Sequence, residues 1–392
     1  MIKKIKKIIK KTFIFDVFIS LKNGNYAYYM CVFPINKKKI FISNFQGKPY
    51  GESPKYVVEE LLKRDKSYKI YWLVTKEFIK EHVDGIEYIE LGSLKAKYHM
   101  ATSKFWLDNA RKTFYVPKRK KQIYIQLWHG IGPKMAEKDI ELSLSKEYVK
   151  YAKNDSKMTD YILSPAEKFT KDILPAFWFD GPVLDFGLPR NDILKISDTR
   201  SYRKNLEKFL NENLDQKILL YAPTFRKNLK KNKYDLDLIR LKENLEKTFG
   251  GTYSILVRYH PNIPLEKNKN DVNSIIKDVS LYPDMAELLA ISDCFITDYS
   301  SSLNDYILTN KIALVYASDI QEFNQDRGFY YKLEQVTGFV AENNDELEEY
   351  LNKFDFADYK VKINKFKKDI GLNEEFNASN KVVDLLLSLN EK

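Results

Sequence analysis

The residues best suited to chemistry in this 392-residue chain follow an apolar run, Cys294–Thr297, that is typical of a buried strand. Next come Asp298-Tyr299-Ser300-Ser301-Ser302, and residues 303–308 are predicted to form a helix. A strand that ends in a serine-rich turn and opens a helix presents backbone N–H groups and hydroxyls to one point, which favours an anion. For Ser300 alone, an ordinary helix cap is the simpler interpretation. Asp305, about one turn further on, is placed to accept hydrogen bonds from a ribose.

Two upstream strand ends carry residues that suit the same ligand. Thr224 and Arg226 follow one apolar run, and Arg258 and His260 follow the next. In an open parallel sheet, ligands bind outside the carboxyl ends of the strands. Arginine offers forked donors to phosphate, and histidine donates to a phosphate oxygen or a leaving group. Each arginine alone is more often a solvated surface charge, but three matched strand ends predict one phosphate-binding crevice.

A further candidate lies in the first half of the chain, where a predicted strand over 122–127 ends in Trp128-His129-Gly130. A histidine at a strand end, ahead of a helix start, is well placed to accept a proton from a substrate hydroxyl. The alternative is a structural histidine held by backbone carbonyls in a tight turn. His82 and His99 have no such companions and are interpreted as structural or surface residues.

Seven segments occur in an order that resembles one enzyme family: 44–55, 128–130 with Lys134, 187–192, 222–226, 258–261, 297–305 and 327–330. The resemblance is to the glycerophosphotransferases that build teichoic acids from CDP-glycerol, together with the related ribitol-phosphate enzymes. It implies an α/β fold of the GT-B type, with two doubly wound Rossmann-like domains facing a central cleft. It also implies that the essential histidines of the family fall on His129 and His260.

The implied reaction moves an alditol phosphate from a CDP-alditol to a hydroxyl of a lipid-linked saccharide or polymer acceptor and releases CMP. His129 is expected to act as general base. The residues expected to bind the donor phosphates, together with His260, are Thr224, Arg226, Arg258, Ser300, Ser301 and Ser302. His260 has a second possible role, as the acid that protonates the leaving phosphate. Gly130, Lys134 and Lys48 are assigned to the acceptor side.

Four questions stay open from the sequence alone. The donor is CDP-glycerol or CDP-ribitol, and the enzyme is a primase or a polymerase. A GT-B glycosyltransferase that uses a nucleotide sugar would share the fold and the phosphate site. A basic membrane-binding protein without activity is the alternative from another class, but it leaves the strand-end motifs unexplained.

Composition and charge fit a folded two-domain protein. The chain is 44% hydrophobic and 30% charged, which describes a globular protein rather than a disordered one. Its two cysteines, Cys31 and Cys294, are far apart and suggest no disulfide framework. No cluster of histidine, cysteine and carboxylate has metal-ligand spacing, so no metal and no other cofactor is expected. The predicted domains are an acceptor domain over 22–195 and a CDP-alditol domain with C-terminal helices over 196–392.

The net charge of +11 is unevenly placed, because six lysines fall within residues 1–11, interleaved with four isoleucines. As a helix this pattern is typical of an interfacial membrane anchor, assigned to residues 1–21. A signal peptide is rejected because no small-residue cleavage site follows. A second basic run covers residues 118–121. Both runs predict a peripheral protein at an anionic membrane surface, on the cytoplasmic face, and no base-reading motif points to nucleic acid.

Hydrophobic patterns predict the elements that carry these residues. Strands are expected at 39–43, 69–74, 86–91, 105–108, 122–127, 182–186, 218–221, 253–257 and 294–297. Helices are expected at 54–64, 146–153, 165–174, 202–211, 235–247, 283–290 and 303–308. The alternation of strands and helices predicts parallel sheets.

Overall fold

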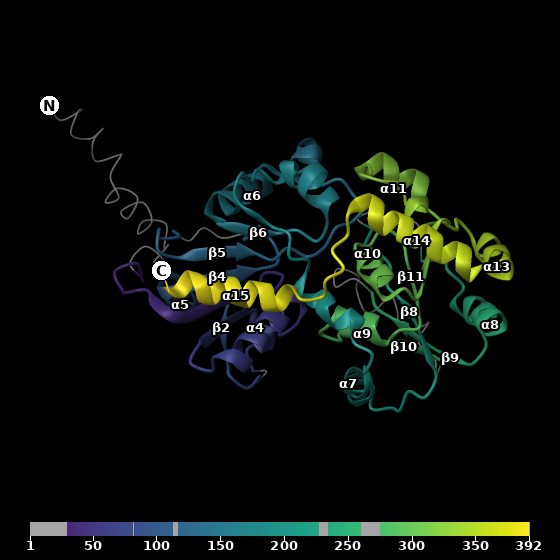
Figure 1. The fold of residues 1–392 in the computed structure, drawn as a ribbon, viewed down its shortest axis with the longest axis horizontal. Coiled ribbons are helices and arrows are strands. Elements are labelled where there is room, and N and C mark those ends of the chain that lie inside the picture. The colour runs from purple at the N-terminus through teal and green to yellow at the C-terminus, as the bar shows by residue number, and fades with distance from the viewer. Residues whose placement is uncertain (1–29, 81, 113–116, 227–233, 260–274, 392) are drawn as a thin grey trace.

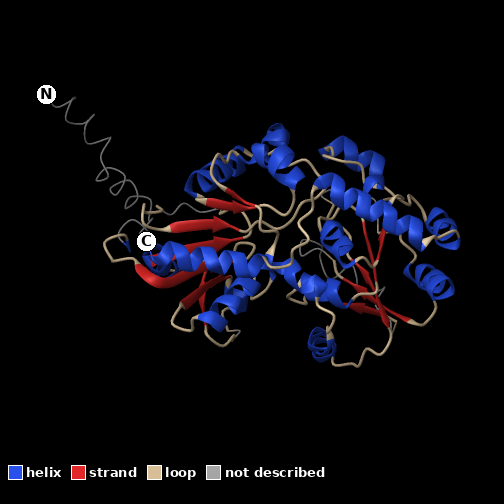
Figure 2. Cartoon of the chain, in the orientation of Figure 1, coloured by secondary structure: helices blue, strands red, loops and turns tan. Residues whose placement is uncertain are grey.

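The protein folds into two domains that lie side by side, each built on a parallel sheet with helices around it (Figures 1 and 2). The computed structural model describes residues 30–80, 82–112, 117–226, 234–259 and 275–391. The strand order is β3-β2-β1-β4-β5-β6-β7 in the first sheet and β10-β9-β8-β11-β12 in the second. The expected doubly wound α/β architecture is therefore confirmed.

The first domain contains the seven-stranded sheet and the helices that cover it. Its strands are β1 (Asn36–Ser43), β2 (Lys69–Val74), β3 (Ile86–Glu90), β4 (Ser103–Asp108), β5 (Ile123–Gln126), β6 (Tyr161–Leu163) and β7 (Val183–Leu184). Its helices are α4 (Glu52–Arg64), η1 (Lys76–Phe78), α5 (Leu94–Thr102), η2 (Glu137–Ser143), α6 (Lys146–Met158), η3 (Phe169–Ile173) and η4 (Leu174–Phe177). The segment η5 (Pro189–Lys195) leads to the second domain.

The second domain contains the five-stranded sheet. Its strands are β8 (Lys217–Tyr221), β9 (Tyr253–Val257), β10 (Ile276–Asp278), β11 (Cys294–Thr297) and β12 (Ile312–Val315). Its helices are α7 (Arg200–Leu210), α8 (Leu238–Phe249), α9 (Met285–Ile291), α10 (Ser302–Tyr306), η7 (Ile307–Thr309), α11 (Ile320–Arg327), α12 (Glu334–Thr337), α13 (Asn344–Asn352) and α14 (Phe356–Ile370). Every residue of β9 and β11 is buried, as expected for strands covered on both faces.

The strand order fixes where a ligand can bind. In the first sheet the order reverses at β1 and β4, and in the second it reverses at β8 and β11. Loops that leave the carboxyl ends of such neighbouring strands diverge to opposite faces of the sheet and leave a crevice. The chain segments after these four strands therefore line the site.

The C-terminal helix α15 (Ala378–Glu391) corrects the predicted division into domains. The sequence predicts that it belongs to the second domain, but Val382, Val383 and Leu386 are buried in the core of the first domain with residues of α4. In Figure 1 it lies across the first sheet after the chain returns from the second domain. Asp192 in η5 accepts hydrogen bonds from the N–H groups of Ala378 (2.9 Å) and Ser379 (2.8 Å) and so fixes the start of this helix.

Some sequence-based expectations fall outside the described residues: the basic segment 1–21 and the proposed catalytic residue His260. In the described part of the chain, no helix has both the length and the apolar character needed to cross a membrane.

Candidate active site

The site lies where loops of the two domains meet, and His129 is the titratable residue at its centre. His129 follows β5, and the ring of the preceding Trp128 lies 4.2 Å from its own. Trp128 has a φ of 52° and Gly130 a φ of 119°, so this turn holds unusual backbone angles on both sides of the histidine. Backbone strain of this kind persists only where surrounding contacts hold it in place, and it is concentrated at functional sites.

The hydrogen bonds of His129 define which ring nitrogen can act as a base. Nδ1 lies 2.6 Å from the carbonyl oxygen of Asn109, and because a carbonyl only accepts, Nδ1 carries the proton. Nε2 is then unprotonated, and it has no hydrogen-bond partner among the described residues. Asn109 is itself fixed, since its Oδ1 accepts from the N–H of Phe45 (2.8 Å) and its Nδ2 donates to Asn44 Oδ1 (2.8 Å). Loops after β1 and β4 thus orient the imidazole of a residue that follows β5.

The electrostatic surroundings keep this imidazole neutral. Burial lowers the pKa of His129 to about 4, although the hydrogen bond to Asn109 opposes the shift. The positive charges of Arg190, Lys134 and Arg111 lower the pKa further. At neutral pH the ring is therefore in the form that accepts a proton, as a general base requires.

The serine turn of the second domain lies directly against the histidine loop. A Cβ added to Gly130 would lie 3.1 Å from the Cβ and Oγ of Ser301, and one added to Gly132 would lie 3.5 Å from the Cβ of Ser301. Asn304 in α10 also donates to the carbonyl oxygen of Ile131 (2.8 Å). The structure thus brings His129 and the serine turn together, as the sequence analysis expected.

Only part of the serine turn is available to an anion. The N–H of Ser302 donates to Ser300 Oγ (3.2 Å), whereas the N–H groups of Ser300 and Ser301 have no bond to another described residue. Of the three N–H groups that were expected to bind phosphate, only those of Ser300 and Ser301 are therefore available. The three serines are half-buried, and Ser301 lies at the contact between the domains.

Arg190 links both domains at this point, and its role was missed. Its guanidinium donates to Glu52 Oε2 (2.7 Å), to Asp305 Oδ2 (2.5 Å) and to the carbonyl oxygen of His129 (2.9 Å). Burial alone would lower the pKa of Arg190, but the two carboxylates outweigh it and hold the pKa above the ordinary value. Arg190 therefore stays charged and fixes the backbone of the proposed base.

Two assignments made from the sequence need correction. Asp305 was expected to accept from a ribose, but it is buried and its other carboxylate oxygen accepts from Asn191 (3.0 Å), so both oxygens are occupied within the protein. Arg226 was expected to hold phosphate. Its guanidinium instead binds Asp319 (2.7 and 2.9 Å), Asp298 (2.9 Å) and a backbone carbonyl (2.6 Å). Both side chains are paired within the protein and do not present these groups to a ligand.

Arg258 has the better geometry for a phosphate ligand. It follows β9, and the only hydrogen-bond partner of its guanidinium among the described residues is the carbonyl oxygen of Tyr282 (2.7 Å). Burial lowers the pKa of Arg258 below its ordinary value, against the attraction of Glu52 and Asp284. A half-buried guanidinium with unused donors favours an incoming anion. Thr224 is fixed nearby, since its N–H donates to Asp298 (2.9 Å).

The acceptor-side candidates lie in two different places. Lys134 belongs to the histidine loop, which pairs with the second domain through a bridge to Phe329 and through the bond from Tyr330 N to Pro133 O (2.6 Å). Lys48 lies in the loop after β1, and its ammonium is 5.5 Å from the centre of the Phe78 ring. Of these two, only Lys134 lies close enough to His129 to affect its pKa.

Two sequence signals would have identified the missed residues. Asn109 directly follows β4, so the strand-end rule that selected His129 applies to it as well. Arg190 and Glu52 lie inside the segments 187–192 and 44–55, which carried the family resemblance but received no role.

Replacing Gly130 with alanine tests the close packing between the domains. The new Cβ would lie 2.8 Å from Arg190 Nη2 in a backbone conformation with φ of 119°, so we expect a loss of roughly 1–3 kcal/mol in unfolding free energy. We expect activity to fall about tenfold or more, because the histidine and the serine turn would shift apart. Gly92→Ala is the control, since Gly92 has a φ of 82° but no atom within 4 Å of the added Cβ. Equal losses in both variants, measured by urea unfolding and by rate, would remove the packing argument.

Comparisons with known proteins agree with this geometry. The sequence profile of CDP-glycerol:poly(glycerophosphate) glycerophosphotransferases matches residues 26–388. The chain is 30% identical to the teichoic acid poly(glycerol phosphate) polymerase of Bacillus spizizenii, over 90% of this chain and 93% of the relative. It is 29% identical to the Bacillus subtilis protein of the same name, over 84% of this chain, and spans about half of that relative (46%).

A solved structure shows the same architecture. A variant of the wall teichoic acid polymerase TagF superposes with a TM-score of 0.79 at 29% identity, with 95% of each chain covered. This similarity over both domains confirms the predicted GT-B type fold. The chain belongs to the CDP-glycerol:poly(glycerophosphate) glycerophosphotransferase family.

Proposed function

We propose that the protein transfers glycerol phosphate from CDP-glycerol to a hydroxyl group of a teichoic acid acceptor and releases CMP. Family membership and the names of the relatives support the substrate class, and a TagF structure at 29% identity was soaked with CDPG. The observation that carries the proposal is His129, a neutral imidazole with its tautomer fixed by Asn109 and packed beside Ser301 of the other domain.

In the proposed reaction the acceptor oxygen forms a bond to the β-phosphorus of CDP-glycerol. The bond from that phosphorus to the bridging oxygen breaks, and CMP leaves with that oxygen. The proton of the acceptor hydroxyl passes to Nε2 of His129. Arg258 and the N–H groups of Ser300 and Ser301 are proposed to neutralise the charge that develops on the phosphates. His260 keeps its proposed role as phosphate ligand or acid.

Separate incubations with CDP-glycerol and CDP-ribitol, each with a lipid-linked acceptor, test the proposal. We expect acceptor-dependent release of CMP and a new phosphodiester with CDP-glycerol. Turnover of CDP-ribitol alone would move the assignment to the ribitol branch, whose members include a ribitol-phosphate primase at 27% identity. Release of a nucleoside diphosphate from a nucleotide sugar would contradict the proposal.

We also propose that the protein works at the cytoplasmic face of a membrane on a lipid-linked acceptor. The support is the sequence of residues 1–11, with six lysines and four isoleucines. The second basic run is less available, because Lys118 binds Asp160 (2.9 Å) and Arg119 binds the carbonyl oxygen of Phe33 (2.8 Å).

Deleting residues 1–12 tests the membrane proposal. Each lysine near an anionic leaflet contributes at most about 1 kcal/mol, so we expect the truncated protein to leave anionic vesicles and to transfer slowly to a lipid-linked acceptor. Transfer to a short soluble acceptor is expected to survive, since no site residue is removed. Unchanged vesicle binding would show that the membrane contact lies elsewhere.

A further inference from the structure

A second polar pocket lies at the opposite end of the first sheet from His129. It has a volume of 260 Å³ and lies between the amino ends of β1 and β2 and the last turns of α5. Lys39, Lys69, Tyr71, Tyr98, His99 and Thr102 line it. At about 3.3 Å per strand residue, Lys39 lies roughly 17 Å from Asn44 at the other end of β1, so the pocket is separate from the active site.

Lys39 is the unusual residue of this pocket. Its side chain is buried (4% exposed), and among the described residues no carboxylate lies within ion-pair distance of its ammonium. The ammonium donates to the Thr102 hydroxyl and lies over the rings of Tyr71 (4.7 Å) and Tyr98 (4.6 Å). Burial lowers the pKa of Lys39 to about 8, against the attraction of the Glu87 carboxylate, and the charge of Lys69 adds to the downward shift. Burying a cation without an anionic partner costs free energy, so binding an anion beside Lys39 would lower this cost.

Lys69 adds a second positive charge to the pocket, and His99 adds a neutral imidazole. His99 is 8% exposed, its ring stacks on Tyr71 at 3.8 Å, and its Nδ1 has no hydrogen-bond partner within the part of the chain that the structure describes. Burial and the charge of Lys39 lower the pKa of His99 to about 4. Lys69 is paired in register with Lys39 on the neighbouring strand, so two cations stand side by side. The pocket thus combines two ammonium groups with an imidazole.

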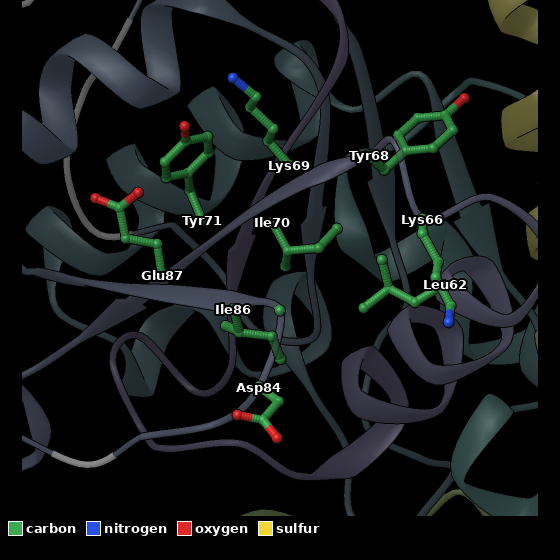
Figure 3. A pocket seen from close by; sticks show the side chains of 10 residues that line it. Leu62, Lys66, Tyr68, Lys69, Ile70, Tyr71, Asp84, Ile86 and Glu87 are labelled. Atoms are coloured by element: carbon green, nitrogen blue, oxygen red, sulfur yellow. The ribbon is translucent and has the colours of Figure 1, made fainter.

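The nearby negative groups are already occupied. Glu87 lies close to Tyr71 (Figure 3), and its carboxylate forms an ion pair with Lys95 (2.5 Å). The carbonyl oxygens at the end of α5 accept from other groups, among them Tyr98 O from Thr102 Oγ1 (2.7 Å) and Met100 O from Trp106 Nε1 (2.8 Å). The negative end of this helix is therefore covered and does not repel an anion.

At the rim of the pocket, Tyr98 (36% exposed) is the lining residue with an exposed aromatic ring. Two exposed apolar residues lie beside Tyr98: Phe33 (44%) packs edge-on against it with ring centres 5.3 Å apart, and Leu94 (57%) lies one turn earlier on α5. The volume is below the roughly 300–1,000 Å³ of pockets that enclose drug-sized ligands, which favours a small charged group. A larger open hollow of 760 Å³ beside β2 and β3 shares Lys69 and Tyr71 with it (Figure 3).

We propose that this pocket binds a phosphate group, supplied either by a phospholipid headgroup or by a soluble phosphate ester. Lys39 and Lys69 would bind its oxygens, and the exposed rim residues would contact the carbon chain attached to it. The proposal stands on binding alone and does not depend on the transfer reaction at His129.

The test for the shared chemistry follows the ring of His99 by NMR during titration with glycerol 3-phosphate. With four histidines in the chain, His99→Gln identifies its resonance. We expect a saturable shift, no shift with glycerol, and at least about tenfold weaker binding in Lys39→Met and in Lys69→Gln. Lys69 is exposed, so the second variant should fold normally. Lys66→Gln is the matched control, because Lys66 is an exposed lysine that lines only the larger hollow.

A second arm distinguishes the two sources. Sedimentation with phosphatidylglycerol and phosphatidylcholine vesicles measures membrane binding of the same variants of the full chain. A loss of about tenfold on phosphatidylglycerol vesicles in Lys69→Gln, but not in Lys66→Gln, would assign the pocket to a lipid headgroup. Unchanged vesicle binding with a retained His99 shift would assign it to a soluble ester. If His99 does not respond, or responds equally in Lys39→Met, and vesicle binding is equal in all variants, the proposal is overturned.

Discussion

Replacing His129 with glutamine is expected to lower the rate of transfer by ~10² to 10⁴, the usual contribution of a positioned general base. Glutamine keeps a donor for the Asn109 carbonyl but has no basic nitrogen, so binding of the donor substrate should persist. The measurement is CMP release at saturating CDP-glycerol. His82→Gln is the matched control, since His82 is exposed, with its side chain 82% accessible, and should keep its rate within about twofold. A His129→Gln enzyme with more than half of wild-type activity would remove His129 from the mechanism.

The pH dependence of the rate gives a second measure of the same residue. The base must be unprotonated, and burial lowers the pKa of His129 to about 4 in the free protein. We therefore expect the contribution of His129 to kcat/KM to stay constant from pH 8 down to about 5.5 and to be lost as pH falls through about 4. An imidazole with an ordinary pKa would lose activity near pH 6.5 instead. An acid limb near 6.5 that disappears in His129→Gln would contradict the buried environment described above.

Replacing Arg190 with methionine is expected to produce the largest loss of stability among single changes at the site. It leaves the buried carboxylates of Glu52 and Asp305 without their cation, and breaking such a buried pair costs roughly 3–5 kcal/mol. Arg64→Met is the control, because Arg64 also contacts two carboxylates but is exposed, where such pairs contribute about 0–1 kcal/mol. Urea unfolding of both variants measures the difference. Similar losses would show that Arg190 is an ordinary ion pair.

A positioning role for Arg190 predicts more than a loss of stability. Its charge lowers the pKa of His129, so Arg190→Met should move the acid limb of kcat/KM to higher pH in the fraction that folds. Arg190→Lys keeps the charge but not the fork that joins both carboxylates and the His129 carbonyl. We expect it to leave the limb nearly in place while kcat falls. An unchanged limb in Arg190→Met would restrict Arg190 to a structural role.

The sequence predicted nine of the twelve strands in the described part of the chain, and the positions of the site loops, because both depend on local patterns; it missed β6, β10 and β12, which have only three or four residues each. Continuous apolar runs such as Tyr253–Val257 mark covered parallel strands, and His129 was selected because it follows one of them. The helix α5 was not expected, because its stretch is polar and amphipathic with little apolar signal. Local patterns also predicted C-terminal helices, but they carry no information on which sheet a returning helix such as α15 will cover.

The roles of charged residues could not be predicted in the same way. Arg226 and Asp319 are far apart in sequence, and only the fold shows that Asp319 occupies the guanidinium that seemed ready for phosphate. For Asp305, the carboxylate is the group that was expected to contact the ligand. Its partner Arg190, which occupies it, lies in the segment that joins the domains. A single sequence indicates which residues reach a crevice. It does not indicate which of them neutralise one another before a ligand arrives.

The return of the chain to the first domain restricts how the two halves can move. The polypeptide crosses between the domains once after η5 and again before α15, and Asp192 ties the second crossing to the first. Two adjacent covalent crossings act as a double-stranded hinge, which permits rotation about one axis but resists twisting and sliding. Any opening between the domains would then swing the serine turn away from His129 along a single arc and return it to the same place. A protease cut within residues 196–199 alone would remove one of the two connections and with it the single rotation axis. The two domains would still be joined by the connection that leads into α15.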